Sequence, residues 1–217
     1  LGGHWHLEHE ACGRDHREPF DAVLVTAPAP QARDILGRSE LEGIDCSVVN
    51  EALERVGYHP QWCFALGFGR ALEARPNCFA LINSDRYHDI AWLSFENHKP
   101  ERELGGRTVV MVQMSPQWSA RHLEKPAEEL FSPVSRAVSS LLGPPEGSVD
   151  WYDSQRWRFA HPCSAADESA LMACESAGLF FAGDALIGKG RVGEAMTTGL
   201  RAADRIVAML GQSHRPA

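Results

Sequence analysis

The segment from Leu179 to Leu210, LFFAGDALIGKGRVGEAMTTGLRAADRIVAML, limits the possible folds of this chain more than any other. A short apolar run ends at Gly183 and Asp184, a glycine-containing stretch follows, and a helical pattern begins at Val192. Strand, glycine turn and helix in this order predict part of an α/β sheet, where ligands bind at the carboxyl ends of the strands. A carboxylate at such an end can accept hydrogen bonds from ligand hydroxyls, and the helix that follows offers unpaired N–H groups.

A second apolar run, FDAVLVTAP at residues 20–28, lies near the other end of the chain. It is continuous rather than alternating, which is typical of a strand buried on both faces of a sheet. Pro28 and Pro30 end the run, and a helix is predicted to follow them. We therefore expect this run and the run ending at Asp184 to lie in one α/β unit.

Four apolar runs separated by polar or turn-forming segments occupy the middle of the chain: WCFALGFG, CFALINS, IAWLSFEN and TVVMVQMS. Their spacing predicts an antiparallel sheet. A later segment around Pro133 is predicted to form one helix or two, because proline breaks the helical hydrogen-bond pattern. The predicted fold class is α/β plus α+β, with a partial Rossmann-like unit from residues 1–35 and 175–217 and an inserted antiparallel-sheet domain over residues 36–174.

Composition excludes several classes of protein. The 21 basic and 29 acidic residues give a net charge of −8, and no dense Lys/Arg run offsets it, which argues against binding to nucleic acid or to an acidic membrane. No apolar stretch approaches the roughly 18 residues that a membrane span needs. Six cysteines occur without a C-x-x-C pair, which is typical of reduced thiols and predicts a cytoplasmic protein.

His4, His6 and His9 are the residues that most suggest a metal site. Residues 4 and 6 share one face of a predicted strand, so two imidazoles can converge. Zinc needs three or four ligands, however, and no cysteine or carboxylate cluster has matching spacing. Solvated histidines are the simpler interpretation, and no metal is predicted.

Five segments, in order along nearly the whole chain, resemble the flavin-containing amine oxidase superfamily, and within it the renalase-like branch. They are FDAVLVTAPAPQARDIL, SFENHKPERE, VVMVQMSPQWSARHLEKPAEE, SQRWRFAHP and FAGDALIGKGRVGEAMTTGLRAA. The resemblance implies that residues 1–35 and 175–217 bind FAD and that residues 36–174 form a substrate domain. The residues implied to hold the cofactor are Gly183, Asp184, Gly190, Arg191, Val192 and Ala195, with Thr26 and Pro28, for which a packing role is the alternative.

The same resemblance implies transfer of a hydride from a reduced small molecule to flavin N5, followed by reoxidation with O₂ to give H₂O₂. Isomeric dihydronicotinamide nucleotides are the implied substrates of the renalase-like branch. Gln113 and Asn97 can hydrogen-bond a carboxamide, and Trp157 and Arg158 can line the flavin or contact a substrate phosphate. The alternatives are polar residues at strand ends, a core tryptophan and a surface arginine.

Two departures from the family pattern leave other functions open. We expect no G-x-G-x-x-G anywhere in the chain and no acidic ribose ligand downstream of one; in family members these residues open the chain and bind the ADP half of FAD. It also reads Gly193-Glu194-Ala195 where relatives often read Glu-Gly-Ala, so a side chain stands close to the expected flavin. We therefore expect the C-terminal part of a longer FAD-dependent oxidoreductase. The alternatives are a non-catalytic remnant or partner-binding module without cofactor, and a related amine oxidase or desaturase-like flavoenzyme acting on another substrate, such as an amine.

Overall fold

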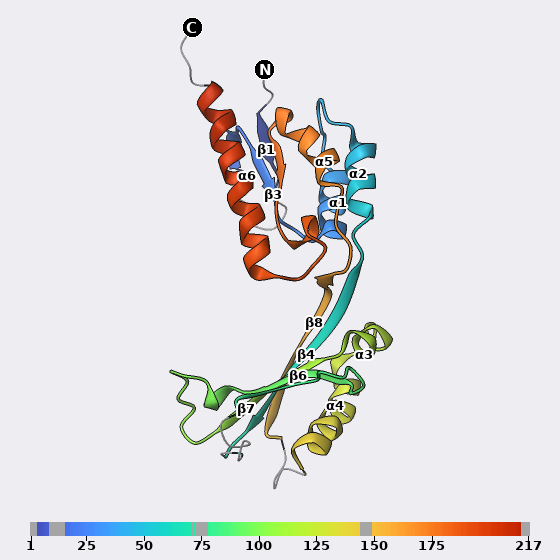
Figure 1. The fold of residues 1–217 in the computed structure, drawn as a ribbon, viewed down its shortest axis with the longest axis vertical. Coiled ribbons are helices and arrows are strands. Elements are labelled where there is room, and N and C mark those ends of the chain that lie inside the picture. The colour runs from blue at the N-terminus through green and yellow to red at the C-terminus, as the bar shows by residue number, and fades with distance from the viewer. Residues whose placement is uncertain (1–3, 9–15, 71, 73–77, 144–148, 214–217) are drawn as a thin grey trace. The chain divides into compact units, whose positions relative to one another are not determined.

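The computed structural model describes residues 4–8, 16–70, 72, 78–143 and 149–213, and the chain divides into two compact units (Figure 1). The first unit is formed by Leu1–Tyr58 and His161–Ala217, and the second by His59–Ala160. These limits differ from the predicted boundaries after residues 35 and 174. The reason is packing, because two helices that lie within residues 36–174 contribute buried residues to the core of the first unit.

The first unit contains two small sheets. Val23–Val25 (β3) pairs in parallel with Leu179–Phe181 (β9), and Trp5–Leu7 (β1) pairs antiparallel with His16–Phe20 (β2). The register joins Val23 to Leu179 and Val25 to Phe181. The expectation that the two apolar runs from opposite ends of the chain meet is thereby confirmed.

Helices supply the rest of the first unit: Ala29–Gly37 (α1), Cys46–Glu54 (α2), Glu168–Met172 (α5) and Val192–Ser213 (α6), with short 3₁₀ turns at Ala173–Ala177 (η2) and Asp184–Leu186 (η3). Pro28 is the N-cap of α1, and Asp45 caps α2 by accepting hydrogen bonds from two backbone N–H groups of its first turn. Buried residues of α1, α2 and α5 pack with β9 in one core.

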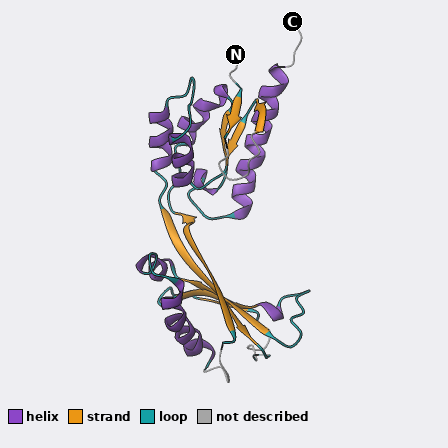
Figure 2. Cartoon of the chain, turned by 180° about the vertical axis from the view of Figure 1, so that it is seen from behind, coloured by secondary structure: helices purple, strands orange, loops and turns teal. Residues whose placement is uncertain are grey.

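The second unit is a five-stranded sheet in the order β5-β6-β7-β4-β8. Its strands are Tyr58–Phe68 (β4), Ala80–Ile82 (β5), Ile90–Phe95 (β6), Thr108–Met114 (β7) and Trp151–Pro162 (β8). The pairs β5–β6, β6–β7 and β7–β4 are all antiparallel, as the sequence predicted. Glu96–His98 (η1), Pro116–Arg121 (α3) and Ala127–Leu142 (α4) complete the unit (Figure 2).

Alternation along the strands gives this sheet two different faces. Phe64, Leu66, Val110 and Val112 point to one side and pack against buried residues of α4. Their neighbours in sequence, such as Cys63 and Gln113, point to the opposite side and are only half-buried. We call that side the open face of the sheet.

Helix α4 settles the question that the sequence left open, because it runs without interruption through Pro133. The proline removes one backbone hydrogen bond. Leu130, Val134 and Val138 are all buried against the sheet, and their burial holds the turns on both sides of the proline in one helix.

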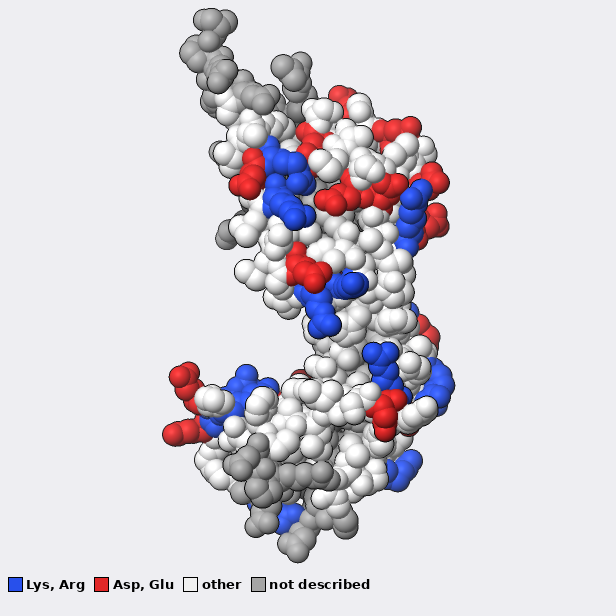
Figure 3. All heavy atoms as spheres, in the orientation of Figure 1, with Lys and Arg blue, Asp and Glu red and all other residues white. Residues whose placement is uncertain are grey.

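None of the helices in the described ranges is long and apolar enough to span a bilayer. On the face shown in Figure 3, acidic and basic side chains stand beside one another rather than in separate fields.

Candidate functional site

The chain leaves β9 through Gly183, whose φ of 119° and ψ of −178° suit glycine alone. A Cβ atom at this position would lie 3.6 Å from the carbonyl oxygen of Thr26, so this glycine runs close beside the end of β3. The N–H of Ala182 donates to the carbonyl oxygen of Val25 at 3.1 Å and closes the parallel pair. The carboxyl ends of β3 and β9 therefore form one edge, with Thr26, Pro28 and Asp184 directly beyond it.

Thr198 of α6 fixes this turn from the helix side. Its buried hydroxyl oxygen accepts a hydrogen bond from the N–H of Gly183 at 2.8 Å and lies 2.7 Å from the carbonyl oxygen of Ala195, to which it donates. One side chain thus ties the strand end to the second turn of α6. No pattern in the sequence points to Thr198, since a threonine within a helix gives no signal of which distant backbone group it will meet.

Asp184 is the first residue of η3 and is half-buried. Within the described part of the chain, no ion pair or hydrogen bond engages its carboxylate. Its exposure to a groove lined by Gly183 and Gly190 stays a prediction.

Tyr58 lies close enough to Asp184 to sense its charge. The tyrosine oxygen accepts a hydrogen bond from the N–H of Ala29 at 2.9 Å. Burial raises the pKa of Tyr58 above 10, the Ala29 N–H opposes this, and the negative charge of Asp184 adds to the increase. A neutral hydroxyl and a free carboxylate therefore stand at the same strand edge. The sequence offered no sign of this role for Tyr58.

Gly188 and Gly190 have packing reasons that the sequence did not reveal. Gly188 has a φ of 70°, and a Cβ there would approach the backbone of Ser164 and Ala165 to 2.6 Å. A Cβ at Gly190 would lie 2.7 Å from Nδ1 of His161. Gly188 therefore has a steric reason that holds whether or not an anion binds, whereas the contact at Gly190 is with a side chain that can move. Contact between Gly190 and a cofactor stays a prediction.

The same glycines correct one expectation, because the spacing G-x-G-x-x-G does occur in this chain, at Gly188, Gly190 and Gly193. In a dinucleotide-binding fingerprint the first glycine follows its strand directly. Here η3 separates β9 from Gly188. The spacing therefore does not replace the opening turn that the family resemblance implies.

Helix α6 begins at Val192 with an exposed first turn. Ala195 is half-buried, and its N–H donates to the carbonyl oxygen of Arg191 at 2.9 Å. The N–H groups of Val192, Gly193 and Glu194 make no hydrogen bond within the described residues. The positive end of the helix dipole is available there to an anion, although the carboxylate of Glu194 shares the turn.

Gln113 and Trp157 both belong to the open face of the second unit. Gln113 is paired in register with Cys63 of β4 and Trp92 of β6. Trp157, which is 53% exposed, is close enough to Cys63 to hydrogen-bond its sulfur. Burial raises the pKa of Cys63 to about 11 despite that contact, so this thiol stays protonated at neutral pH.

The structure does not bring Arg158 to the same face. Its guanidinium forms a forked pair, at 2.6 and 3.0 Å, with Glu124, which lies in the connection between α3 and α4. Neighbouring residues of a strand point to opposite sides, so Trp157 and Arg158 cannot line one site. Asn97 lies in η1, where its buried Oδ1 atom has no hydrogen-bond partner within the described residues.

A buried carboxylate that the sequence did not predict lies next to Asn97. Glu96 contacts Lys99, Arg102 and the hydroxyl of Ser94. Burial by itself raises the pKa of Glu96, but the hydrogen bonds from Lys99 and Ser94 and the charges of Lys99 and Arg102 outweigh it and lower the pKa. Lys99 also lies over the ring of Trp92, 5.4 Å from its centre.

Of the histidines considered for a metal, His4 and His6 are exposed in the first unit. His4 lies 3.5 Å from Asp21, and His9 falls outside the described residues. Within the described ranges, no group of three or more His, Cys, Asp or Glu side chains is arranged to hold a metal ion.

Comparison with known proteins now adds two findings. The sequence profile of the family described as flavin containing amine oxidoreductase matches residues 10–207. Among solved structures, similarity extends to a protein assigned as protoporphyrinogen oxidase from Exiguobacterium sp. 255-15 (TM-score 0.64, 16% identity, 90% of this chain and 43% of that one). Reduced UDP-galactopyranose mutase matches with a TM-score of 0.64 and 13% identity over 90% of this chain and 43% of its own. Cyclohexylamine oxidase from Brevibacterium oxydans IH-35A matches with a TM-score of 0.61 and 11% identity over 95% and 46%.

These structures carry different activities, and at such low identity their likeness shows the fold alone. The chain spans 43–46% of the length of the three structures.

Proposed function

Because the chain belongs to the flavin-containing amine oxidoreductase family, we propose that it forms the flavin-facing part and the substrate sheet of an FAD-dependent oxidoreductase. One observation carries the proposal: the half-buried carboxylate of Asp184 has no partner among the described residues and stands at the carboxyl edge of two parallel strands. Such edges bind ligands in α/β proteins. An unpaired carboxylate there is explained if a ligand supplies the missing hydrogen-bond donors.

The residues at this edge fit FAD in chemical type. Asp184 can accept hydrogen bonds from ribityl hydroxyls, and the free N–H groups at the start of α6 can face the negative edge of the reduced flavin. Thr26 and Pro28 close the other side, next to β3. In the proposal, the first unit is a partial Rossmann-like FAD-binding unit and the second is the substrate domain. Glu194 is the one residue at this edge that disfavours an anionic flavin, because it brings a second negative charge to the turn.

The bound cofactor would accept a hydride from the substrate and pass electrons to O₂, giving H₂O₂. The chain itself would bind and orient the substrate on the open face of the sheet. Trp157 offers an aromatic surface, and the Gln113 carboxamide can exchange hydrogen bonds with a polar substrate group. Cys63 is held as a neutral thiol and supplies no base. This division of labour matches a reaction whose chemistry resides in the cofactor.

For the substrate we propose an isomeric dihydronicotinamide nucleotide, as the renalase-like resemblance implies. One observation favours a second candidate, a primary amine. Arg158, the residue expected to contact a substrate phosphate, is already paired with Glu124 and lies off the open face. The family description and the likeness to an amine oxidase support that second candidate.

We propose the complete oxidoreductase activity only for a protein that also carries the binding site for the ADP half of FAD. The hydrogen bonds of a pyrophosphate site are charge-assisted and worth about 1.5–3 kcal/mol each. Since about 1.4 kcal/mol is tenfold in affinity, losing several of them weakens binding by several decades. We therefore expect residues 1–217 alone to purify without colour.

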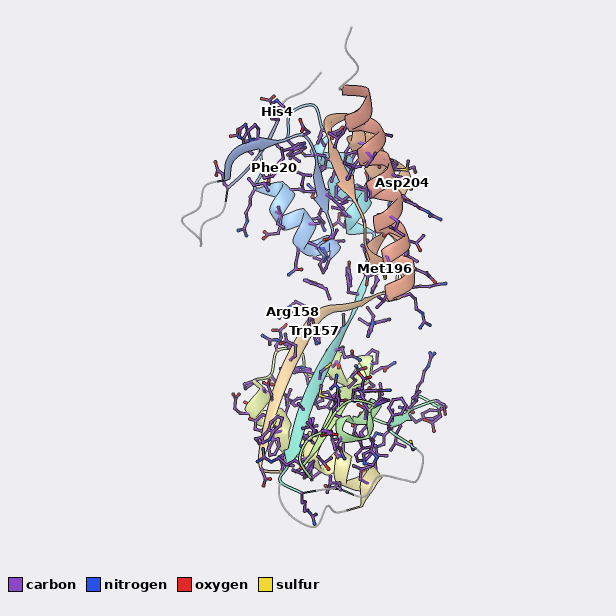
Figure 4. All side chains as sticks on the ribbon, turned by 90° about the vertical axis from the view of Figure 1, so that its left-hand side faces the viewer. His4, Phe20, Trp157, Arg158, Met196 and Asp204 are labelled. Atoms are coloured by element: carbon purple, nitrogen blue, oxygen red, sulfur yellow. The ribbon has the colours of Figure 1, made fainter. Side chains whose placement is uncertain are left out.

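The test compares Asp184→Asn with Asp204→Asn in the presence of the polypeptide encoded directly upstream of Leu1. Asp204 is an exposed carboxylate further along α6 and serves as the matched control (Figure 4). In a flavin fluorescence titration, Asp184→Asn should bind FAD at least about tenfold more weakly than the parent protein, and Asp204→Asn should bind it with unchanged affinity. Equal affinities for the two variants would remove Asp184 from the site.

Turnover is measured in the same preparation as H₂O₂ release with isomeric dihydronicotinamide nucleotides and with primary amines. Oxidation of the nucleotides supports the first substrate, and oxidation of amines alone supports the second. A preparation that never binds flavin would favour the non-catalytic, partner-binding interpretation.

A further inference from the structure

Helix α6 carries a line of exposed apolar side chains that nothing in the described structure covers. Val192, Met196, Leu200 and Val207 are 79%, 64%, 68% and 68% exposed. Residues spaced by four, eight and fifteen positions lie on one side of an α-helix, and the exposed Ala203 fills the gap between the last two. We call these five residues the apolar stripe of α6.

The stripe is separate from the side of α6 that packs within the first unit. Thr198 and Ala202 are buried on that side, and Ala195 is half-buried there. A third side is polar and exposed, with Thr197, Arg201 and Asp204. A helix at the surface of a finished domain normally has one apolar side. Helix α6 has two, which marks the second as a surface that another element covers.

The sheet beneath α6 is incomplete in the same way. Strands β3 and β9 form a parallel sheet of two strands, and β9 pairs with no other described strand. Parallel sheets are normally larger and have helices packed on both faces. Leu24, in the middle of β3, is 39% exposed, so this sheet also leaves apolar surface uncovered.

The solved structures that resemble this chain extend well beyond the region that it matches. They match 88–95% of this chain, but the match accounts for only 43–46% of their own length. More than half of each related protein thus lies outside the matched region. The stripe begins at Val192, in the turn of α6 that follows Asp184 and its glycines.

We infer that the apolar stripe of α6 is the docking surface for the polypeptide that completes the α/β unit, by adding a parallel strand and a helix. A second copy of this chain is the competing occupant. It is disfavoured because it would leave the two-stranded sheet incomplete. The inference rests on the proposed function in one respect only, namely that a polypeptide completing the flavin-binding unit exists.

The test uses residues 1–217 and the polypeptide encoded directly upstream of Leu1, purified separately and mixed. Met196→Glu and Leu200→Glu each place a charge in the stripe. Thr197→Glu adds the same charge one residue away, on the polar side, and is the matched control. All three positions are exposed, so the variants should retain the far-UV circular dichroism and melting temperature of the parent chain. Binding is measured by calorimetry without flavin, which keeps it independent of cofactor affinity.

We expect Met196→Glu and Leu200→Glu to weaken association about tenfold or more, because a charge is buried in an apolar contact, and Thr197→Glu to leave it unchanged. Equal binding by all three variants overturns the inference. So does a wild-type chain that dimerises through the stripe, or an upstream sequence that encodes no polypeptide able to bind. Association that depends on the stripe but yields no flavin binding would contradict the proposed function and leave the docking surface standing.

Discussion

Thr198 is the residue whose hydroxyl decides the geometry of the strand end. Replacing it by valine keeps the branched shape but leaves the N–H of Gly183 without its acceptor. We expect Thr198→Val to lower the free energy of unfolding by about 1–3 kcal/mol, because a buried donor loses its partner. Urea denaturation followed by circular dichroism measures the loss. Thr197→Val, at the exposed neighbouring position, should change it by less than about 0.5 kcal/mol. Equal effects of the two changes would show that the bond to Gly183 contributes nothing.

Glu96 should make the stability of the second unit depend on acid. Its folded pKa lies below its usual value of 4.5, so its stabilising contribution is present above that value and is lost as pH falls through the folded pKa. At pH 7, Glu96→Gln should cost about 1–3 kcal/mol, because Lys99 and Arg102 lose a buried acceptor. The difference between parent and variant should shrink at about pH 3. A difference that stays constant from pH 7 to pH 3 would contradict the assignment.

Single residues also show what the sequence predicted well and what it did not. The position of Asp184 after a buried strand followed from local pattern, because strand, glycine and carboxylate are neighbours in the chain. The bonds of Thr198 and Tyr58 join residues far apart in sequence, and no pattern records them. Arg158 is a different case. Neighbouring residues of a strand point to opposite faces of the sheet, so the sequence alone could have placed Arg158 and Trp157 on different faces.

At the scale of elements, the loop between β9 and α6 depends on glycine for steric reasons. Gly188→Ala should destabilise the protein by at least about 2 kcal/mol, because alanine tolerates a φ of 70° poorly and its Cβ would press on the backbone of residues 164–165. Gly199→Ala is the control: this glycine lies inside α6 with no atom within 4 Å of its Cβ position, and the change should stabilise by about 0.5–1 kcal/mol. Relative to the parent protein, the melting temperature should fall for Gly188→Ala and rise for Gly199→Ala. A neutral Gly188→Ala would mean that the loop can move away from residues 164–165.

The elements themselves were largely predictable because their patterns are local. The four middle runs, the helix that follows β3 and the start of α6 at Val192 all appear in the structure. Domain limits were less predictable. Whether α2 and α5 pack on the first core or on the second sheet depends on tertiary contacts of residues such as Val49 and Leu171, which periodicity does not encode.

The whole molecule contains a second unit whose core is its own, drawn from residues between Trp62 and Tyr152. A polypeptide of residues 59–160 should therefore fold alone and unfold cooperatively in urea, with a near-UV circular dichroism signal from its tryptophans. Leu66→Ala in this polypeptide should lower its stability by about 2–5 kcal/mol, because Leu66 is fully buried. A gradual transition without near-UV signal would show that the sheet needs the first unit.

The pairing of Val23 with Leu179 also determines the order in which a nascent chain can fold. At about 5–20 residues per second, the ribosome delivers β9 roughly 8–30 s after β3. Residues 59–160 emerge completely within that interval, so the inserted unit can fold during translation while β3 still lacks its neighbour. The apolar β3 segment must then be kept from aggregating, either by chaperones or by transient contacts with the helices that follow it in the chain. Synthesis rate and chaperone supply, rather than the stability of the finished protein, should therefore limit the yield of soluble chain.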